Sequence, residues 1–431
     1  MLVAVAVAAA LGILIAADLT LPVYLLGSSI VLIDGFDMAA RLYLRHSAVR
    51  HDDYADEPAG KPLPFAILLS IHNMEQELDQ LQADLADYRS RVWIIDDAST
   101  DATVARLRAS GWRHLVCAEN RKKPGAIREL LRQLPPEIRT VLVMDPDVRL
   151  PRNLAERIHR FQQSGAAALC PKLTIRPDGA LAELQHIEFG LSFDLGRHSL
   201  SPHTVTSGIA VYDRDALEAA MREHSLSVYG EDLENAVSIL GAGKDIVYDP
   251  ALVVETEGKR EFAGWFSQRV GWSFSLLKIY AEHFGDVRRI LTRSPMAFYQ
   301  FGIYFVVLCL VLWPFKILSI ALLSYSALNG IDELLALGVI ADNALNHPGL
   351  FAASYIKYTL LALAAYVLVT PARQVLRGVA FMPFFFLYCV ALVIPTSVGY
   401  LNWIALRLTG RRIYNDHYDD NPVLGRNRSY V

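Results

Sequence analysis

Apolar residues are concentrated toward the two ends of this chain, and this distribution limits the folds that it can adopt. Residues 2–34 are almost uninterrupted apolar sequence, with Asp18 and Asp34 as the charged residues. Three further apolar blocks cover about residues 298–326, 350–370 and 378–406. Because about 20 helical residues cross the ~30 Å core of a bilayer, these blocks predict membrane-spanning helices on both sides of a polar middle.

The N-terminal block is too long for one comfortable span and contains a helix breaker, Pro22. We therefore expect two short spans, about residues 2–17 and 20–38, joined by a turn. A cleaved signal peptide is the alternative, but no basic residue precedes the apolar run and a second run follows it. Three arginines come after the second span, at Arg41, Arg45 and Arg50. By the positive-inside rule, they put the polar middle of the chain in the cytoplasm.

The topology of the C-terminal blocks stays open at this point. Pro314 and Pro395 lie inside the first and third blocks, so either block is expected to be kinked or broken. Arginines follow the second and the third block, and both sets favour the cytoplasm although a single span separates them. Either the last block turns back near Pro395, or the charge rule fails here.

Composition excludes several classes of protein. Lys plus Arg total 41 and Asp plus Glu total 45, a net charge of −4 that argues against a nucleic-acid-binding protein. Hydrophobic residues make up 53% of the chain and charged residues 20%, which favours a membrane protein. The sequence contains no GxxxxGK[ST] or GxGxxG motif, which excludes a P-loop or a dinucleotide site of the usual kind. The cysteines form no CxxC pair, so they indicate neither a disulfide framework nor a zinc site.

The polar middle alternates predicted strands with predicted helices. The runs at 65–70, 92–95 and 141–144 are short and continuously apolar, as expected of strands buried on both faces. This alternation predicts an α/β fold with a mostly parallel central sheet, in which ligands bind beyond the carboxyl ends of the strands. Those ends carry polar residues, namely Asn73, Asp97, Asp145 and Asp147.

Asp145 and Asp147 flank a proline directly after the third predicted strand. Two carboxylates at this spacing suit a hard divalent cation such as Mg²⁺ or Mn²⁺, which commonly bridges a diphosphate. The alternative is that Asp-Pro-Asp forms a turn and caps the next helix. Acidic residues also follow the preceding strand, and this joint placement favours the ligand-binding interpretation.

Five motifs, in this order, resemble those of family 2 glycosyltransferases of the GT-A fold. They cover about residues 65–280 and include Ser70-Ile-His-Asn-Met-Glu75 with Trp93–Thr103, Lys122–Ala126, Val143–Val148, Thr206–Ala210 with Gly230-Glu-Asp232, and Trp265–Trp272. Apolar blocks on both flanks make the chain similar to the membrane-integrated cellulose, hyaluronan and chitin synthase branch. The resemblance thus implies a GT-A nucleotide-sugar-binding domain flanked by transmembrane helices.

This interpretation divides the chain into five parts. We expect N-terminal transmembrane helices at 1–40, a cytoplasmic GT-A catalytic domain at 62–258, amphipathic interface helices at 259–297, a C-terminal transmembrane region of about three segments at 298–406 and a basic tail at 407–431.

The resemblance implies a hexosyltransferase that takes a UDP-sugar and inverts its anomeric centre. Asp97 would contact the uridine, with Asn73 near the same pocket, and Lys123 would meet the donor. Asp145 and Asp147 would hold the diphosphate through Mg²⁺ or Mn²⁺. From the residues alone, Lys122 and Lys123 are about as well explained by a solvated basic turn.

On the acceptor side, Asp232 would be the general base, with Glu231 beside it in the Glu-Asp motif. The alternative is that Asp232 is an acidic residue favoured at a helix N-terminus. The same resemblance assigns Ser207 and Gly208 to the acceptor-side loop.

The segment from Trp265 to Trp272 resembles the Gln-x-x-Arg-Trp signature of membrane polysaccharide synthases. Trp265 would stack on the acceptor sugar, whereas Gln268, Arg269 and Trp272 would contact the donor. An amphipathic helix at the bilayer surface explains the same residues. Gly271 stands where the family has arginine, so both processive synthesis and transfer of a single sugar stay open.

We therefore expect a membrane-embedded enzyme that extends an extracellular polysaccharide. In one form of this hypothesis, the enzyme also passes the growing polysaccharide through its own membrane helices. The alternative is transfer of one sugar to a lipid or polyprenyl-linked acceptor. A catalytically inactive scaffold is the alternative from another class, although the motif acids are retained. The expected partners are the UDP-sugar, a carbohydrate or glycolipid acceptor and the bilayer of a bacterial inner or plasma membrane, without nucleic acid; the sequence does not determine whether a partner subunit is needed.

Overall fold

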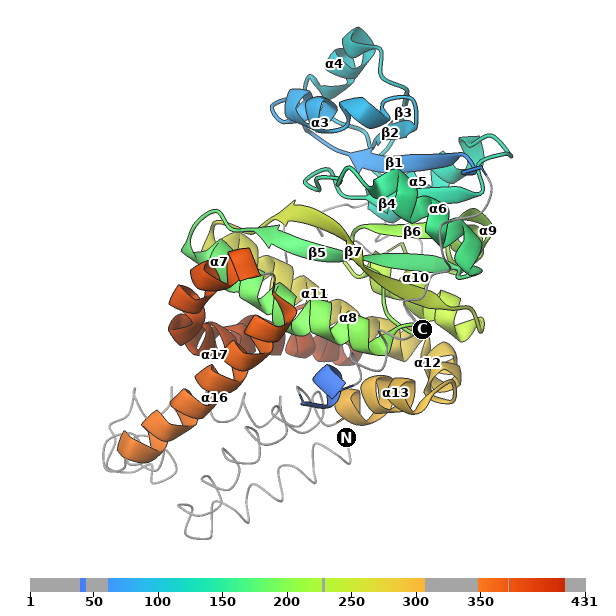
Figure 1. The fold of residues 1–431 in the computed structure, drawn as a ribbon. Helices are drawn as coiled ribbons and strands as arrows, with labels where there is room; N and C mark the ends of the chain where they lie inside the picture. Colours follow the sequence, from blue (N-terminus) through green and yellow to red (C-terminus); the bar gives the residue numbers. More distant parts are fainter. Residues whose placement is uncertain (1–38, 44–60, 227–228, 307–347, 371, 415–431) are drawn as a thin grey trace.

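The computed structural model describes residues 39–43, 61–226, 229–306, 348–370 and 372–414 (Figure 1). The predicted spans at 2–17 and 20–38, most of the apolar block at 298–326 and the tail from residue 415 lie outside the described residues.

Seven strands form one sheet in the order β3-β2-β1-β4-β6-β5-β7 (Figure 1). Their bounds are β1 Phe65–Ile71, β2 Val92–Asp96, β3 His114–Val116, β4 Thr140–Met144, β5 Ala168–Arg176, β6 Ala210–Asp213 and β7 Ile246–Glu257. Strands β1, β2 and β4 coincide with the three predicted apolar runs to within one residue at either end, which confirms those predictions.

The sheet is mostly parallel, as the sequence predicts. Strand β1 pairs in parallel with β2 and β4, β2 with β3, and β5 with β7. Strand β6 runs antiparallel to both of its neighbours, β4 and β5. The carboxyl ends of β1, β2 and β4 therefore lie along one edge of the sheet, where a parallel arrangement gathers ligand-binding loops.

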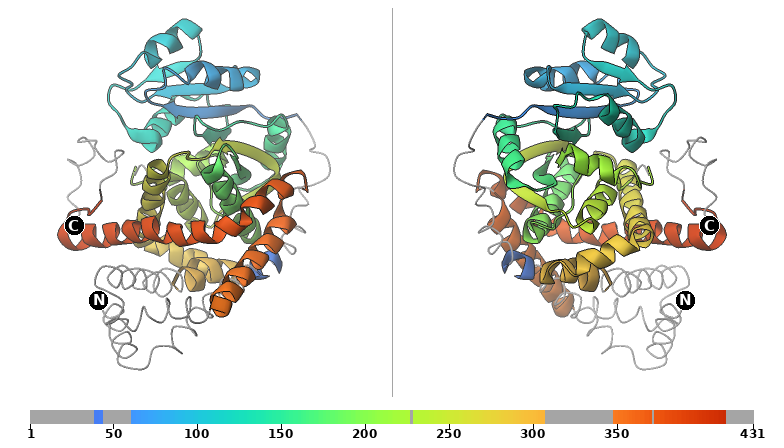
Figure 2. Two further views of the ribbon diagram at one scale, coloured as in Figure 1. Left: turned by 90° about the vertical axis from the view of Figure 1, so that its left-hand side faces the viewer. Right: turned by 90° about the vertical axis from the view of Figure 1, so that its right-hand side faces the viewer.

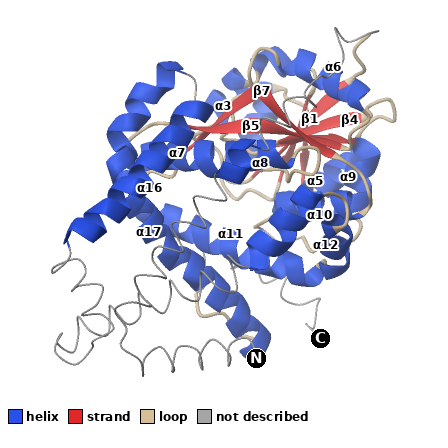
Figure 3. Ribbon diagram, turned by 60° about the horizontal axis from the view of Figure 1, so that its bottom comes forward, coloured by secondary structure: helices blue, strands red, loops and turns tan. Residues whose placement is uncertain are grey.

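Helices cover both faces of this sheet (Figure 3). On one face lie α3 (Leu78–Asp84), α4 (Thr103–Ser110) and α6 (Leu154–Ser164), and on the other α5 (Lys122–Gln133), α9 (Arg214–Ala220) and α10 (Glu231–Gly241). Successive β1 side chains alternate between them, since Ile67 packs with the first group and Leu68 with the second. Both are fully buried, which explains why the strand sequence is apolar without alternation.

The remaining elements lie around these two helical layers, and some of their side chains join the buried core. Their bounds are η2 Ala86–Tyr88, α7 Ala180–Glu188, η3 Phe189–Asp194, α8 Leu195–Leu200, α11 Phe262–Glu282, α12 Phe284–Leu291, α13 Pro295–Ala297, η4 Phe298–Tyr304, α16 Pro348–Val369 and α17 Ala372–Thr409. Helix α17 runs across the molecule beside α11, on the side away from β1 to β3 (Figures 1 and 2).

Helix α17 is continuous over 38 residues and contains Pro383 and Pro395. The chain therefore does not turn back at Pro395, which removes the re-entrant alternative for the last apolar block. Within α17, the segment Leu387–Thr409 has a mean hydropathy of 1.7 and is long and apolar enough to cross a membrane by length and composition. Among the described residues, one helix meets this criterion.

Candidate active site

The loops that follow β1 and β2 are joined to each other at the carboxyl edge of the sheet. The backbone N–H of Asn73 donates to Ser99 Oγ at 2.8 Å, and the backbone N–H of Thr100 donates to Asn73 Oδ1 at 2.8 Å. Asn73 has φ of 51°, in the left-handed region that asparagine tolerates better than most residues. These contacts fix Asn73 close to the loop that carries Asp97.

Asp97 is 3% exposed and connects the end of β2 with the start of α5. Its Oδ1 accepts a hydrogen bond from the backbone N–H of Arg121 at 2.7 Å. Burial raises the pKa of Asp97, while the Arg121 hydrogen bond and the charge of His72 oppose this rise. The contact places the first turn of α5, and with it Lys123, next to the predicted nucleotide-binding residues.

Lys123 lies at the centre of the site. Its ammonium group contacts Asp145 Oδ1 at 2.5 Å and Glu231 Oε1 at 2.8 Å, and it donates to the carbonyl oxygen of Gly208 at 3.1 Å. Burial alone would lower the pKa of Lys123, but the two carboxylates raise it above its usual range. This lysine therefore connects three predicted site segments that are far apart in the sequence.

Asp145 follows β4 and faces the backbone of Gly208. A Cβ atom at Gly208 would overlap with Asp145 Oδ2, so this close approach requires glycine. Partial burial raises the pKa of Asp145 to about 6, the Lys123 charge opposes this rise, and the charges of Glu231 and Asp147 add to it. Solvent still reaches 40% of the Asp145 side chain and limits this upward shift. Asp147 is exposed beside it.

Glu231 and Asp232 are the first two residues of α10. The hydroxyl of Thr206 donates to the carbonyl oxygen of Asp232 at 2.7 Å, and Asp232 Oδ1 accepts from the N–H of Leu233 at 2.8 Å. The pKa of Asp232 rises to about 6, because of burial first and the Glu231 charge second, against the effect of Lys123. A carboxylate with such a pKa is a stronger proton acceptor than an ordinary aspartate.

The turn before α10 packs closely against α11, and a glycine on each side, Gly230 and Gly271, allows this close contact. Gly230 has φ of 79°, and a Cβ there would lie 2.8 Å from Ser275 Cβ. A Cβ at Gly271 would lie 2.6 Å from the ring of Tyr229. The hydroxyl of Ser275 donates to the Tyr229 carbonyl oxygen at 2.8 Å. Gly271, which replaces the arginine of the related signature, thus makes room for the aromatic ring next to the Glu231-Asp232 pair.

Ser207 and Gly208 lie between Cys170 and Lys123. Ser207 is 5% exposed, and its hydroxyl donates to the carbonyl oxygen of Ile209 at 2.9 Å. Gly208 contacts Lys123 through its backbone. The predicted acceptor-side loop therefore borders the acidic pair after β4.

Two α11 residues of the predicted site have buried partners in other helices. Arg269 is 3% exposed and pairs with Glu188 of α7 at 2.5 Å, while Trp265 is 1% exposed and its indole N–H donates to Tyr388 of α17 at 2.9 Å. Tyr388 also donates to Glu188. In this structure both side chains hold α7, α11 and α17 together.

Trp272 and Gln268 surround the same arginine. The Arg269 guanidinium lies 4.1 Å above the Trp272 ring and 3.4 Å from Gln268 Oε1. Trp272 also packs edge-on against Phe193 of η3, with ring centroids 5.8 Å apart. Arg269 and Trp272 thus contact α7 and η3. The carboxylates of Asp145 and Glu231 instead contact Lys123.

Sequence reasoning missed several residues that support the site. Arg197 of α8 is 8% exposed, lowers the pKa of Asp232 by its charge and bonds to the Thr206 carbonyl oxygen at 3.4 Å. It stands in a largely apolar stretch, and an isolated arginine there was a usable signal. Tyr229 had no such signal, because its role depends on contact with Gly271 of another helix.

The residues after β4 fit a hard divalent cation. Among the described residues, no group of three or more His, Cys, Asp or Glu is arranged to hold a metal. Mg²⁺ needs no such group, since it is commonly bound by one or two carboxylates together with substrate phosphates and water. Asp145 and Asp147 would supply those carboxylates, and the lack of a Cβ at Gly208 lets Asp145 Oδ2 lie against its backbone.

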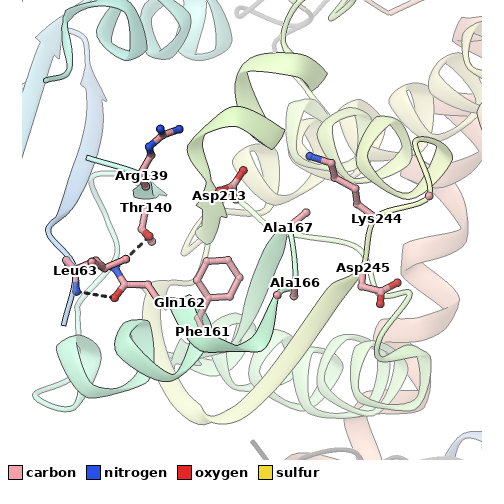
Figure 4. Close-up of a pocket in the computed structure, with 12 residues that line it drawn as sticks. Leu63, Arg139, Thr140, Phe161, Gln162, Ala166, Ala167, Asp213, Lys244 and Asp245 are labelled. Carbon is pink, nitrogen blue, oxygen red and sulfur yellow. Dashed lines mark hydrogen bonds between the residues drawn. The ribbon is translucent and has the colours of Figure 1, made fainter. Parts of the chain in front are cut away.

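A separate cavity of about 480 Å³ lies at the opposite edge of the sheet (Figure 4). It is bordered by the start of β4 at Thr140 and by the segments that precede β5 and β7, and it includes Phe161 of α6 and Lys244. The amide of Gln162 bridges the Leu63 carbonyl oxygen and the Thr140 hydroxyl there, both at 3.1 Å. None of the predicted site residues lines this cavity.

Comparisons with known proteins agree with this arrangement. Residues 66–220 match the family described as Glycosyl transferase family 2. No curated protein sequence matches the chain. A mannosyltransferase from Pyrobaculum calidifontis, solved in complex with GDP-Man and Mn²⁺, is similar with a TM-score of 0.51 and 19% identity, over 87% of this chain and 98% of its own.

A second similar structure is a glucosyl-3-phosphoglycerate synthase from Mycobacterium tuberculosis in complex with UDP. It covers 51% of this chain and 80% of its own, with 16% identity and a TM-score of 0.33.

Proposed function

We propose that this chain, whose residues 66–220 match the family described as Glycosyl transferase family 2, is a glycosyltransferase that transfers a sugar from a nucleoside diphosphate donor to a hydroxyl of an acceptor held at a membrane. The sequence motifs favour a UDP-sugar as the donor. The transfer inverts the configuration of the anomeric carbon. A nucleotide sugar also appears in the mannosyltransferase with a similar fold, which was solved with GDP-Man.

One observation carries this proposal. Lys123 joins Asp145, which follows β4, to Glu231, which adjoins Asp232. One ammonium group therefore contacts a residue expected to hold the donor diphosphate and the residue next to the expected base. Such convergence of a phosphate site and a base is what a single displacement at an anomeric carbon requires.

In the proposed step, Asp232 accepts the proton of the acceptor hydroxyl. The acceptor oxygen then forms a bond to the anomeric carbon while the bond from that carbon to the diphosphate oxygen breaks, and the nucleoside diphosphate leaves. Attack from the face opposite the leaving group inverts the configuration. With its pKa raised to about 6, Asp232 is still mostly ionised at neutral pH, and it is a better proton acceptor than an ordinary aspartate.

On the donor side, we propose that Asn73 and Asp97 contact the nucleoside and that Lys123 meets the diphosphate. Asp145 and Asp147 would hold Mg²⁺ or Mn²⁺, which neutralises charge on the departing diphosphate. The carboxyl-edge position of Asn73, Asp97 and Asp145 supports this assignment, because ligands of such sheets bind there.

On the acceptor side, we propose that Ser207 and Gly208 line the approach to Asp232. Arg269 could contact the donor directly only after breaking its ion pair with Glu188. Trp265 could stack on an acceptor sugar only if α11 and α17 separated, because its indole N–H bonds to Tyr388 of α17. Trp272 is partly exposed, so we propose it and Gln268 as the α11 residues that border the substrates in the closed arrangement.

We propose that α17 and its neighbours attach the enzyme to the membrane, with the catalytic domain in the cytoplasm. The Leu387–Thr409 segment supports this proposal by its length and composition. Large apolar side chains on α16 and α17 are exposed, including Leu360, Leu368, Leu376, Phe384, Leu387 and Leu408.

Two acceptors are compatible with this site. The cellulose, hyaluronan and chitin synthase resemblance favours extension of a polysaccharide. The packing of Tyr229 against Gly271 favours transfer of a single sugar to a lipid-linked acceptor, because an aromatic ring occupies the place next to Asp232 where the synthase signature has an arginine.

The test is turnover of the full-length protein reconstituted in liposomes. UDP- and GDP-sugars would be supplied with Mg²⁺, Mn²⁺ or EDTA, and the products separated by size and by extraction into organic solvent. We expect metal-dependent release of nucleoside diphosphate that is lost in Asp232→Asn, while this variant still binds the donor. Full turnover by Asp232→Asn would refute the assignment of the base, and a high-mass product would refute transfer of a single sugar.

A further inference from the structure

The Lys123 ammonium group uses all of its hydrogen-bonding capacity within the protein. An ammonium has three N–H donors, and Lys123 directs them at Asp145 Oδ1, Glu231 Oε1 and the Gly208 carbonyl oxygen, at 2.5, 2.8 and 3.1 Å. Three acceptors around one cation form a saturated site. In this state Lys123 has no N–H left for a donor phosphate.

The two carboxylates that it bridges come from different elements. Asp145 follows β4, and Glu231 begins α10, so they are 86 positions apart in the chain. Glu231 is 14% exposed and Lys123 is 20% exposed, whereas Asp145 is 40% exposed, so water screens the repulsion between the two acids only from the Asp145 side. A cation between them is therefore needed whenever both are ionised.

We propose that Lys123 is the resident cation of the donor-free site and that it competes with the divalent metal for Asp145. This inference rests on the proposed function, in which Asp145 helps to hold Mg²⁺ or Mn²⁺. The same oxygen, Oδ1, accepts the ammonium at 2.5 Å. Lys123 must leave Asp145 before both oxygens of that carboxylate are open to a metal ion.

The diphosphate of the donor offers Lys123 an alternative partner to Asp145. Its diphosphate carries negative charge into the site and offers acceptors for the ammonium that the protein alone does not. Binding of metal and donor is consequently coupled: the donor-free enzyme binds the metal weakly, and the two ligands bind together. The exchange also frees Glu231, next to Asp232, from its lysine partner.

The experiment measures Mn²⁺ binding by full-length protein in detergent, without any sugar nucleotide, from the electron paramagnetic resonance signal of free Mn²⁺. Lys123→Met and Lys123→Gln remove the competing charge, so we expect each to bind Mn²⁺ about tenfold more tightly than the wild type, in line with the effect of a cation beside a carboxylate. In the same variants, affinity for UDP or GDP in the presence of Mn²⁺ should fall. A lysine with a merely structural role would not shift the two affinities in opposite directions.

Two matched variants complete the test. Lys123→Arg keeps the charge, and we expect Mn²⁺ binding as weak as in the wild type. Lys122→Met removes the same charge one residue away and should change the Mn²⁺ affinity by less than about twofold, because Lys123, whose ammonium contacts Asp145 at 2.5 Å, stays in place. Melting temperatures identify any variant that does not fold, and Lys123→Gln then stands in for Lys123→Met.

Unchanged or weaker Mn²⁺ binding by folded Lys123→Met and Lys123→Gln would overturn the proposal. Mn²⁺ binding by none of these proteins, with UDP and GDP both present, would overturn it together with the metal role in the proposed function. Tighter Mn²⁺ binding by the two variants without any sugar transfer by the wild type would support the competition while the proposed function fails.

Discussion

Arg269 tests whether α11 acts mainly through packing or through the substrate. The change is Arg269→Met, which keeps much of the length of the side chain and removes its charge. It leaves the Glu188 carboxylate, which is 9% exposed, with the Tyr388 hydroxyl as its described hydrogen-bond donor. It also removes the cation 4.1 Å above the Trp272 ring.

The magnitude follows from the burial of both partners. Removing one member of a buried ion pair typically costs ~3–5 kcal/mol, because the other charge stays buried without compensation. Tyr388 still donates to Glu188, so we take the lower end, about 3 kcal/mol in the free energy of unfolding. At ~2 °C or more per kcal/mol, the melting temperature should fall by roughly 6 °C.

The assay is thermal unfolding of the purified full-length protein in detergent, with donor KM measured in parallel. The double variant Glu188→Gln, Arg269→Met removes both charges and should recover at least ~1 kcal/mol of the loss. Arg260→Met is the matched control, since Arg260 precedes α11 and pairs with Asp178 at an exposed position. A raised donor KM with the melting temperature unchanged would refute the packing role and favour the predicted donor contact.

Three further predictions concern the residues around Asp232. Asp232→Asn should lower kcat by at least ~100-fold, and wild-type kcat/KM, which reports the free enzyme, should rise with pH through about 6, since the ionised base forms above its pKa; a flat profile would contradict this. Gly208→Ala should push the Asp145 carboxylate aside and raise the Mn²⁺ concentration needed for half-maximal turnover, and an unchanged Mn²⁺ requirement would contradict the contact. Gly271→Ala, which overlaps with the Tyr229 ring, should lower kcat more than it changes donor KM; wild-type kinetics would show that this contact is dispensable.

The parts of the site predicted correctly from sequence are those that follow from local pattern. Continuous apolar runs predicted strands β1, β2 and β4, and the rule that ligands bind at the carboxyl ends of parallel strands then placed Asn73, Asp97 and Asp145 on one edge. The antiparallel β6 was not predicted, because strand direction depends on the path of the intervening chain.

The parts that sequence could not predict depend on contacts between distant segments. Lys123 looked equally like a surface lysine, and its role became visible through its contacts with Asp145 and Glu231. Gly271 looked like the loss of a functional arginine, whereas the structure fills its place with Tyr229. Neither inference is available from the spacing of residues along one chain.

Two adjacent residues of α11 contact the turn before α10 and helix α17, respectively. Tyr229 packs on Gly271, while Gly399 of α17 approaches the Val270 carbonyl oxygen so closely that a Cβ would lie 2.5 Å away. The packing that supports the candidate site thus extends past the change from polar to apolar sequence. A chain truncated before residue 372 would strip α11 of its covering helix, and a soluble fragment of this enzyme should be sought by redesigning the exposed face of α17 while retaining the helix.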